Sequence, residues 1–162
     1  MNGTRTLLRR VAAALLLAPL AGCALPGFLS FKGTKVDWSE VTLAAAPLAN
    51  DNSPVAVDIV FALDDAMTDR LAELPAAKWF AARADLLKTY PKSLSYRTWE
   101  LVPGQTLRVA GDSFGSPRVA AVFVYADYVA PGAHRVRVES LKGPLLVRFE
   151  ARSFDAGPPP AP

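Results

Sequence analysis

Apolar and polar residues alternate along most of the chain after residue 35, and this period of two predicts β-strands. The clearest case runs from Val55 to Leu63, where every second residue is Val, Ile, Phe or Leu, as in a half-buried strand. The segment 119–128 is apolar at nearly every position, which is typical of a central strand. A Pro103-Gly104 turn predicts that the strands on either side of it form a hairpin. Strands are therefore predicted over residues 36–45, 55–63, 96–102, 105–110, 119–128, 134–141 and 145–153.

One part of the chain has a helical period instead. Asp64-Asp65 follows the second predicted strand and can cap a helix at its first turn. An apolar stripe then recurs at four and seven residues, at Met67, Leu71 and Leu74. Residues 76–90 are strong helix formers without glycine or proline. Phe80, Ala84 and Leu87 are predicted to share one face of this second helix, with Trp79, Arg83 and Tyr90 beside it.

These elements predict a mainly β domain built as a two-sheet sandwich, with a helical insertion after the second strand. The domain is assigned to residues 36–154, a length that can bury a sizeable core. The Pro-rich segment 155–162 has no core-forming residues and is predicted to be a disordered tail. Fourteen prolines and ten glycines in 162 residues are too many for a helical bundle.

The first 22 residues have the features of an export signal. Three arginines precede an apolar run of about ten residues at 11–20, which is too short to span a membrane. Leu20-Ala21-Gly22-Cys23 follows and resembles a bacterial lipobox, in which diacylglycerol alkylates the cysteine thiol and the preceding bond is cut. We therefore predict a lipoprotein signal peptide at 1–22, lipidation at Cys23 and a lipid-anchored tether at 23–35. The alternative is an ordinary signal peptide with an incidental cysteine.

Removal of that signal changes the charge of the chain. The full sequence has 18 basic and 15 acidic side chains; without residues 1–22 it has 15 of each, so a nucleic-acid partner is not expected. Ala24, rather than aspartate, follows the cysteine, and by resemblance to other lipoproteins the destination is the periplasmic face of the outer membrane. One cysteine and one histidine leave no Cys-cluster site and few His-based sites. We expect no metal and no cofactor.

One motif suggests an enzyme. Gly111-Asp112-Ser113-Phe114-Gly115 fits G-x-S-x-G, and Asp127 and His134 follow in the order of a hydrolase triad. The motif lies between two predicted strands, whereas a nucleophile elbow needs a strand followed by a helix. We therefore interpret it as a glycine-rich loop and expect no catalytic residue. Asp64, Asp65 and Asp69 are likewise better explained by helix capping than by a metal.

A lipobox followed by a small sandwich with a helical insertion resembles TssJ, the outer-membrane lipoprotein family of type VI secretion systems. The resemblance runs over about residues 36–154 and rests on the order of several segments rather than on one motif. These segments are Val41-Thr42-Leu43-Ala44-Ala45, Leu48-Ala49-Asn50-Asp51, Pro54-Val55-Ala56-Val57-Asp58-Ile59, Leu101-Val102-Pro103-Gly104-Gln105 and the strand that begins at Val119 and ends at Asp127.

The resemblance implies a transthyretin-like sandwich that faces the periplasm and docks the secretion membrane complex. The implied partner is the periplasmic domain of the inner-membrane protein TssM, which shares its complex with TssL. In that family the loop between the first two strands contacts TssM; here this is the loop from Pro47 to Pro54, and its candidate contact residues are Asn50, Asp51, Asn52 and Ser53. Two alternatives remain: a ligand-binding or envelope-stress lipoprotein with a similar fold, and, more remotely, a lipid-anchored serine hydrolase.

The lipobox leads to a direct test. Cys23→Ser removes the thiol that accepts the diacylglycerol, so we expect an unlipidated precursor. Radiolabelled palmitate fed to cells should mark the wild type and leave the variant unlabelled. Fractionation of the variant with the outer membrane at wild-type levels would contradict lipidation at Cys23.

Overall fold

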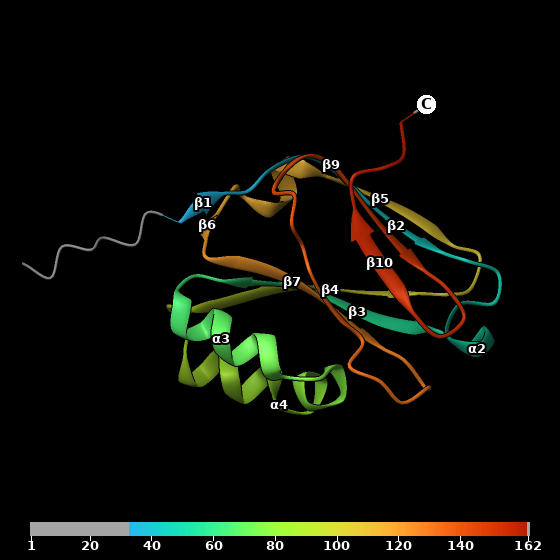
Figure 1. Cartoon of the computed structure of the whole chain (residues 1–162), viewed down its shortest axis with the longest axis horizontal. Coiled ribbons are helices and arrows are strands. Elements are labelled where there is room, and N and C mark those ends of the chain that lie inside the picture. Colours follow the sequence, from blue (N-terminus) through green and yellow to red (C-terminus); the bar gives the residue numbers. More distant parts are fainter. Residues whose placement is uncertain (1–32, 162) are drawn as a thin grey trace, which may run out of the picture. The chain divides into compact units, whose positions relative to one another are not determined.

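The structure is a computed structural model that describes residues 33–161 (Figure 1). The predicted signal peptide and Cys23 lie outside the described residues. The strands are β1 (Thr34–Lys35), β2 (Asp37–Ala45), β3 (Val55–Ala62), β4 (Leu94–Leu101), β5 (Thr106–Ala110), β6 (Arg118–Val119), β7 (Ala121–Asp127), β8 (Arg135–Arg137), β9 (Lys142–Phe149) and β10 (Phe154–Gly157). The helices are α2 (Ala49–Asn52), α3 (Asp65–Glu73), α4 (Ala76–Thr89) and the short 3-10 helix η1 (Gly111–Phe114).

The predicted two-sheet sandwich is confirmed. One sheet has the order β10-β9-β2-β5 and the other the order β4-β3-β7-β8, while β1 and β6 form a small two-stranded sheet. All pairs in these sheets are antiparallel except β2 and β9, which run parallel. The helical insertion follows β3, as predicted, and covers the outer face of the second sheet (Figure 1).

The helical layer explains why β3 differs from the prediction of a half-buried strand. Val57, Ile59 and Phe61 face the core between the sheets, where β2 and β9 contribute Leu43 and Val147. The alternate residues are buried as well, because α3 and α4 pack over them and form a second core. This second core contains Val60, Ala62, Met67, Leu71, Trp79, Phe123 and Tyr125. The sheet is therefore the middle of three layers, and β3 and β7 are buried on both faces.

The predicted hairpin across Pro103-Gly104 is wrong. Gln105 donates its backbone N–H to the carbonyl of Val102 over 3.0 Å, so the chain does turn, but β4 pairs with β3 and β5 pairs with β2 in the other sheet. Gly104, with φ of 80°, donates to the carbonyl of Ala46 at the end of β2 over 3.1 Å. Turn chemistry determines where a chain reverses, whereas packing of Leu107 and Val109 beside the inter-sheet core selects the sheet that β5 joins.

Two further features differ from the prediction: the end of the domain and the buried face of α4. β10 pairs with β9 and extends to Gly157, so residues 155–157 belong to the domain and not to a tail. In α4 the buried residues are Ala76 and Trp79. Of the face shared by Phe80, Ala84 and Leu87, only Phe80 is partly buried, whereas Ala84 and Leu87 are exposed. The capping prediction holds: Asp64 accepts a hydrogen bond from the backbone N–H of Met67 over 2.8 Å and starts α3.

A buried carboxylate fixes α4 to the sheet. Asp58, in the middle of β3, is fully buried and accepts hydrogen bonds from Trp79 Nε1 over 2.8 Å and from the Arg83 guanidinium over 2.6 Å. The hydroxyl of Thr98 on the neighbouring strand β4 donates to its other oxygen. Every one of these donors needs the carboxylate to be in this position, so the network specifies which face of α4 lies against the sheet.

Asp58→Ala should lower the free energy of unfolding by about 3 kcal/mol, because it leaves a buried indole N–H and a partly buried guanidinium without their acceptor. Urea denaturation of the chain from Ala24 onward would measure this loss. Asp85→Ala, at an exposed position of the same helix, is the matched control and should change the value by less than about 0.5 kcal/mol. A loss below 1 kcal/mol for Asp58→Ala would contradict this role.

Candidate functional site

Four connections meet at one end of the sandwich, which we call the α2 end. They are the β2–β3 connection with α2, the β4–β5 turn, the β7–β8 loop and the β9–β10 turn. Backbone hydrogen bonds join three of them: Gly104 donates to Ala46, and Asn50 and Asp51 donate to the carbonyls of Glu150 and Ala151 over 3.1 and 2.9 Å. The β7–β8 loop is joined through the side chain of Asn50. Figure 1 shows this end on the right and β1 at the opposite end.

The segment α2 is not an ordinary helix. Asn50, Asp51 and Asn52 have φ of 50°, 51° and 61°, so three successive residues are left-handed. Such a turn costs most residues free energy, and Asn and Asp are the side-chain-bearing residues that tolerate it best. The run Asn-Asp-Asn, which looks like a solvated polar loop in the sequence, is therefore also the composition that this tight turn requires.

Asn50 holds the site together. Its side chain is buried at 2% exposure, its Nδ2 donates to the carbonyl of Pro54 over 2.7 Å, and its Oδ1 accepts the backbone N–H of Val129 over 2.7 Å. The same residue donates its own N–H to Glu150. Through its side chain and its backbone N–H, Asn50 thus joins the β2–β3, β7–β8 and β9–β10 connections, and it is placed to position the surface rather than to contact a partner.

The other three candidate residues are more accessible. Asp51 is exposed and both of its carboxylate oxygens lie 3.2 Å from Nε of Arg152, in the β9–β10 turn. Asn52 is exposed and Ser53 is half-buried. These polar groups form the crest of the α2 end.

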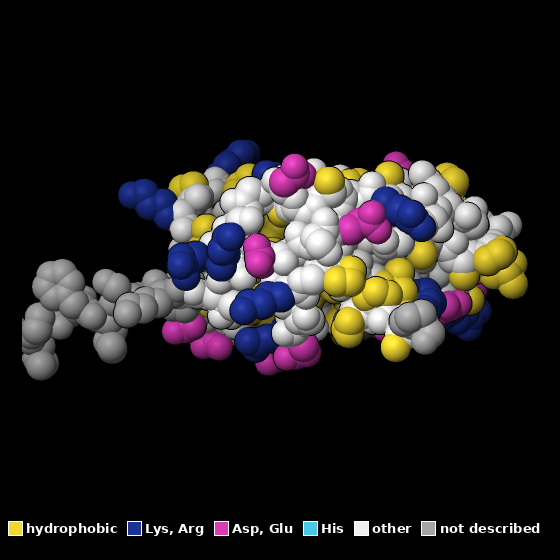
Figure 2. Space-filling model, turned by 90° about the horizontal axis from the view of Figure 1, so that it is seen from above, with side chains coloured by type: hydrophobic (Ala, Val, Ile, Leu, Met, Phe, Trp, Pro, Cys, Tyr) yellow, Lys and Arg dark blue, Asp and Glu magenta, His cyan; other side chains and the backbone are white. Residues whose placement is uncertain are grey.

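Exposed apolar side chains surround that crest, a feature that the sequence reasoning missed. Leu48 is 65% exposed, Val102 53% and Val129 72%. Among residues 33–161, the one other exposed large hydrophobic side chain is Leu87 on α4. Val102 flanks the turn that bonds to Ala46, and Val129 bonds to Asn50, so all three lie around α2. Figure 2 shows hydrophobic side chains gathered at the same right-hand end. Each is an apolar residue in a connection that follows a strand. The sequence alone does not show that the three lie together, because this depends on the loops meeting in the fold.

Aromatic stacking stabilises the β7–β8 loop. Tyr128 stacks on His134 with ring centroids 4.6 Å apart, and its hydroxyl donates to the carbonyls of Ser153 and Glu150 over 2.6 and 3.0 Å. Burial raises the pKa of the Tyr128 phenol far above its ordinary value, which keeps it protonated as a donor. His134 lies 2.7 Å from the carbonyl of Ala130 through Nε2. It is half-buried and packed against Tyr128.

The G-x-S-x-G motif has a structural explanation. It forms η1 between β5 and β6, and Phe114 is buried against Trp38, with ring centroids 5.3 Å apart. At Gly111 a Cβ would lie 1.7 Å from the carbonyl oxygen of Trp38, and Gly115 has φ of 71°, so both glycines are required by the backbone. Ser113 is exposed on the 3-10 turn, and no helix follows it.

Within residues 33–161, no group of three or more His, Cys, Asp or Glu side chains gathers in a way that could hold a metal ion. In the same part of the chain, no helix is long and apolar enough to cross a membrane.

Several solved structures have the same fold. The T6SS lipoprotein TssJ1 from Pseudomonas aeruginosa is 19% identical, with a TM-score of 0.55 over 80% of this chain and 99% of that chain. Lip from Serratia marcescens, a membrane-bound component of the type VI secretion system, is 14% identical, with a TM-score of 0.52 over 74% of this chain and 95% of that chain. A chain in the structure of the T6SS protein TssM C-terminal domain (869-1107) from EAEC is 15% identical, with a TM-score of 0.51, 76% of this chain and 98% of that chain being covered.

These similarities establish the fold as the β-sandwich of the TssJ and Lip structures. The sequence matches no family model, and no curated protein matches it.

The role of Asn50 can be separated from its backbone conformation. Asn50→Gly keeps the positive φ but removes two buried hydrogen bonds, and should lower the free energy of unfolding by about 2 kcal/mol. Asn52→Gly makes the same change at an exposed left-handed position and should alter it by less than about 0.5 kcal/mol. Urea denaturation gives both values, and hydrogen exchange at the Val129 amide should speed up only in Asn50→Gly. Equal effects of the two substitutions would contradict the positioning role.

Proposed function

We propose that this protein is a lipid-anchored periplasmic lipoprotein of the TssJ family. In this proposal it docks the membrane complex of a type VI secretion system to the outer membrane by binding the periplasmic domain of a TssM-like inner-membrane protein. The observation that carries the proposal is the α2 end: a rigid turn surrounded by exposed apolar side chains, on a sandwich whose fold is that of TssJ1 and Lip.

The composition of the α2 end is typical of a protein-binding surface. Leu48, Val102 and Val129 can lose apolar surface to a partner, while Asp51 and Asn52 supply polar groups that fix its orientation. Three connected loops and a left-handed turn hold these groups before any partner arrives. Little conformational entropy would then be lost on binding, which favours affinity from a small contact.

The two ends of the sandwich would have separate tasks. β1 begins at Thr34, close in sequence to the lipidation site proposed at Cys23, and lies at the opposite end of the sandwich from α2 (Figure 1). A lipid anchor in the outer membrane would thus leave the α2 end free to face the periplasm and a protein from the inner membrane.

Replacement of the apolar side chains by a charge tests the contact. Leu48→Asp, Val102→Asp and Val129→Asp, each in the soluble chain from Ala24 onward, should weaken binding to the C-terminal periplasmic domain of the cognate TssM-like protein at least tenfold. The introduced carboxylate would lose its water on binding without gaining a partner, which would weaken each contact. Isothermal titration calorimetry gives the dissociation constants, and circular dichroism shows whether each variant is folded.

Leu87→Asp is the matched control, since Leu87 is also exposed but lies on α4. It should bind within a factor of two of the wild type. Folded variants at the α2 end that bind like this control would eliminate the surface. A wild-type chain that does not bind the domain at all would eliminate the partner.

A further inference from the structure

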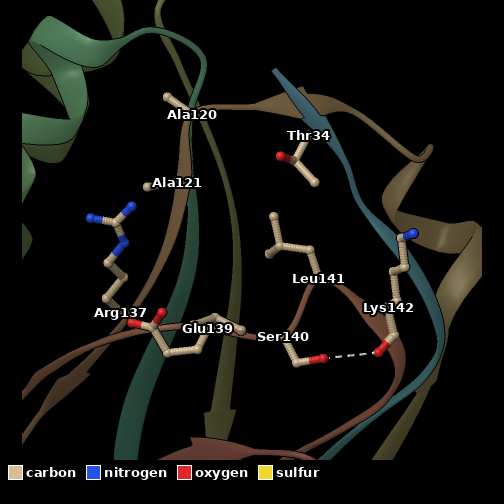
Figure 3. Close-up of a pocket in the computed structure, with 9 residues that line it drawn as sticks. Thr34, Ala120, Ala121, Arg137, Glu139, Ser140, Leu141 and Lys142 are labelled. Atoms are coloured by element: carbon tan, nitrogen blue, oxygen red, sulfur yellow. Dashed lines mark hydrogen bonds between the residues drawn. The ribbon is translucent and has the colours of Figure 1, made fainter. Parts of the chain in front are cut away.

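The end of the sandwich opposite α2 has a groove of about 370 Å³. It lies between β1 and the connection from β8 to β9, and its lining residues include Thr34, Arg137, Ser140, Leu141 and Lys142. Figure 3 shows the Leu141 side chain projecting into the space between Thr34 and Ser140, with Arg137 on the far side. Ser140 Oγ donates to the carbonyl of Lys142 over 3.1 Å, which shapes the rim of the groove.

The surroundings of the groove are basic. The segments 33–37, 116–120 and 137–143 carry two carboxylates, at Asp37 and Glu139, against four cations, at Lys35, Arg118, Arg137 and Lys142. Figure 2 shows Lys and Arg side chains at the left-hand end, where β1 lies, with acidic side chains among them. The lining combines hydroxyl groups, two cations and one carboxylate with the apolar side chains of Ala120, Ala121, Val138 and Leu141. An anionic headgroup with an adjacent hydrocarbon chain would match this mixture.

Two of these cations lie opposite each other beside the groove. Lys35 and Arg118 are direct cross-strand partners in the β1–β6 pair, and like charges in such positions repel. Asp37 lies 3.4 Å from the ammonium of Lys35, and Arg118 donates to the carbonyl of Gly33 over 3.3 Å. The β1–β6 pair therefore places two cations next to the groove, with the carboxylate of Asp37 beside Lys35.

The position of the groove suggests which anion is available. β1 starts eleven residues after Cys23, and eleven extended residues reach at most about 36 Å. If Cys23 carries the anchor, the β1 end is held within this distance of the membrane surface, and phospholipid headgroups are the most concentrated anions there.

We propose that the groove and its basic rim bind anionic phospholipid headgroups and so orient the domain on the membrane. This inference rests on the lipid anchor proposed above. The Arg137 guanidinium can donate two parallel hydrogen bonds to a phosphate, the Lys142 ammonium adds a point charge, and the Thr34 hydroxyl adds a further donor. With the β1 end on the membrane, the α2 end points into the periplasm.

Vesicle sedimentation tests the proposal with the chain from Ala24 onward, which keeps the whole described fold and lacks Cys23. The wild type should bind phosphatidylcholine vesicles containing 30% phosphatidylglycerol. Binding should fall at least tenfold on vesicles of phosphatidylcholine alone and also when salt is raised from 0.1 to 0.5 M. Arg137→Glu with Lys142→Glu should weaken binding to the anionic vesicles more than tenfold, since each cation near such a surface contributes about fivefold.

Lys78→Glu with Arg148→Glu is the matched control, because it makes the same change in net charge at exposed positions of α4 and β9 outside the groove. It should retain binding within a factor of three. Equal losses in the two double variants would overturn the groove as the site. Equal binding to neutral and anionic vesicles would overturn the headgroup as the ligand. Since the assay uses neither the lipid anchor nor a protein partner, failure of the TssM-like contact would leave its result unaffected.

Discussion

Burial of β3 and β7 on both faces is the constraint on which the rest of the structure depends. One face of their sheet packs against the sheet of β2 and β9, and the other against α3 and α4. A sheet whose central strands are apolar on both faces cannot leave one face in contact with water, so the helical insertion is required as a third layer. The buried carboxylate of Asp58 then fixes the position of α4 by accepting from Trp79 and Arg83.

The same construction makes the ends of the sandwich the candidate recognition surfaces. Most large apolar side chains are buried between the sheets or beneath the helical layer. The few that remain exposed therefore indicate candidate binding surfaces. Three of them surround a left-handed turn that Asn50 connects to two other loops. A surface built in this way is held by backbone and amide hydrogen bonds, and its apolar groups are free to contact another protein.

The opposite end differs in chemistry. Basic side chains and hydroxyl groups line a groove beside β1, where the described chain begins. Exposed apolar side chains at one end and a basic groove at the other would suit a protein that connects a membrane to a protein partner. Neither end uses Ser113, whose glycine-flanked turn is explained by the close approach of Gly111 to Trp38 and the left-handed Gly115.

The sequence by itself determined the strands, the two helices of the insertion and the cap at Asp64, because these depend on local periodicity and on hydrogen bonds within a few residues. It also indicated the two-sheet architecture and placed the G-x-S-x-G motif between two strands, where the structure has η1. It placed β5 in the wrong sheet and ended the domain before β10, since strand partners are chosen by packing between residues far apart in the chain.

Only the tertiary structure decided which residues form the candidate sites. Asn50 and Asn52 are the same residue type two positions apart, yet one is buried among three loops and the other is exposed. Val102 and Val129 belong to loops that are 27 positions apart and meet only because β3 pairs with both β4 and β7. Burial and proximity of this kind follow from the assembled sheets, and no local pattern in the chain carries them.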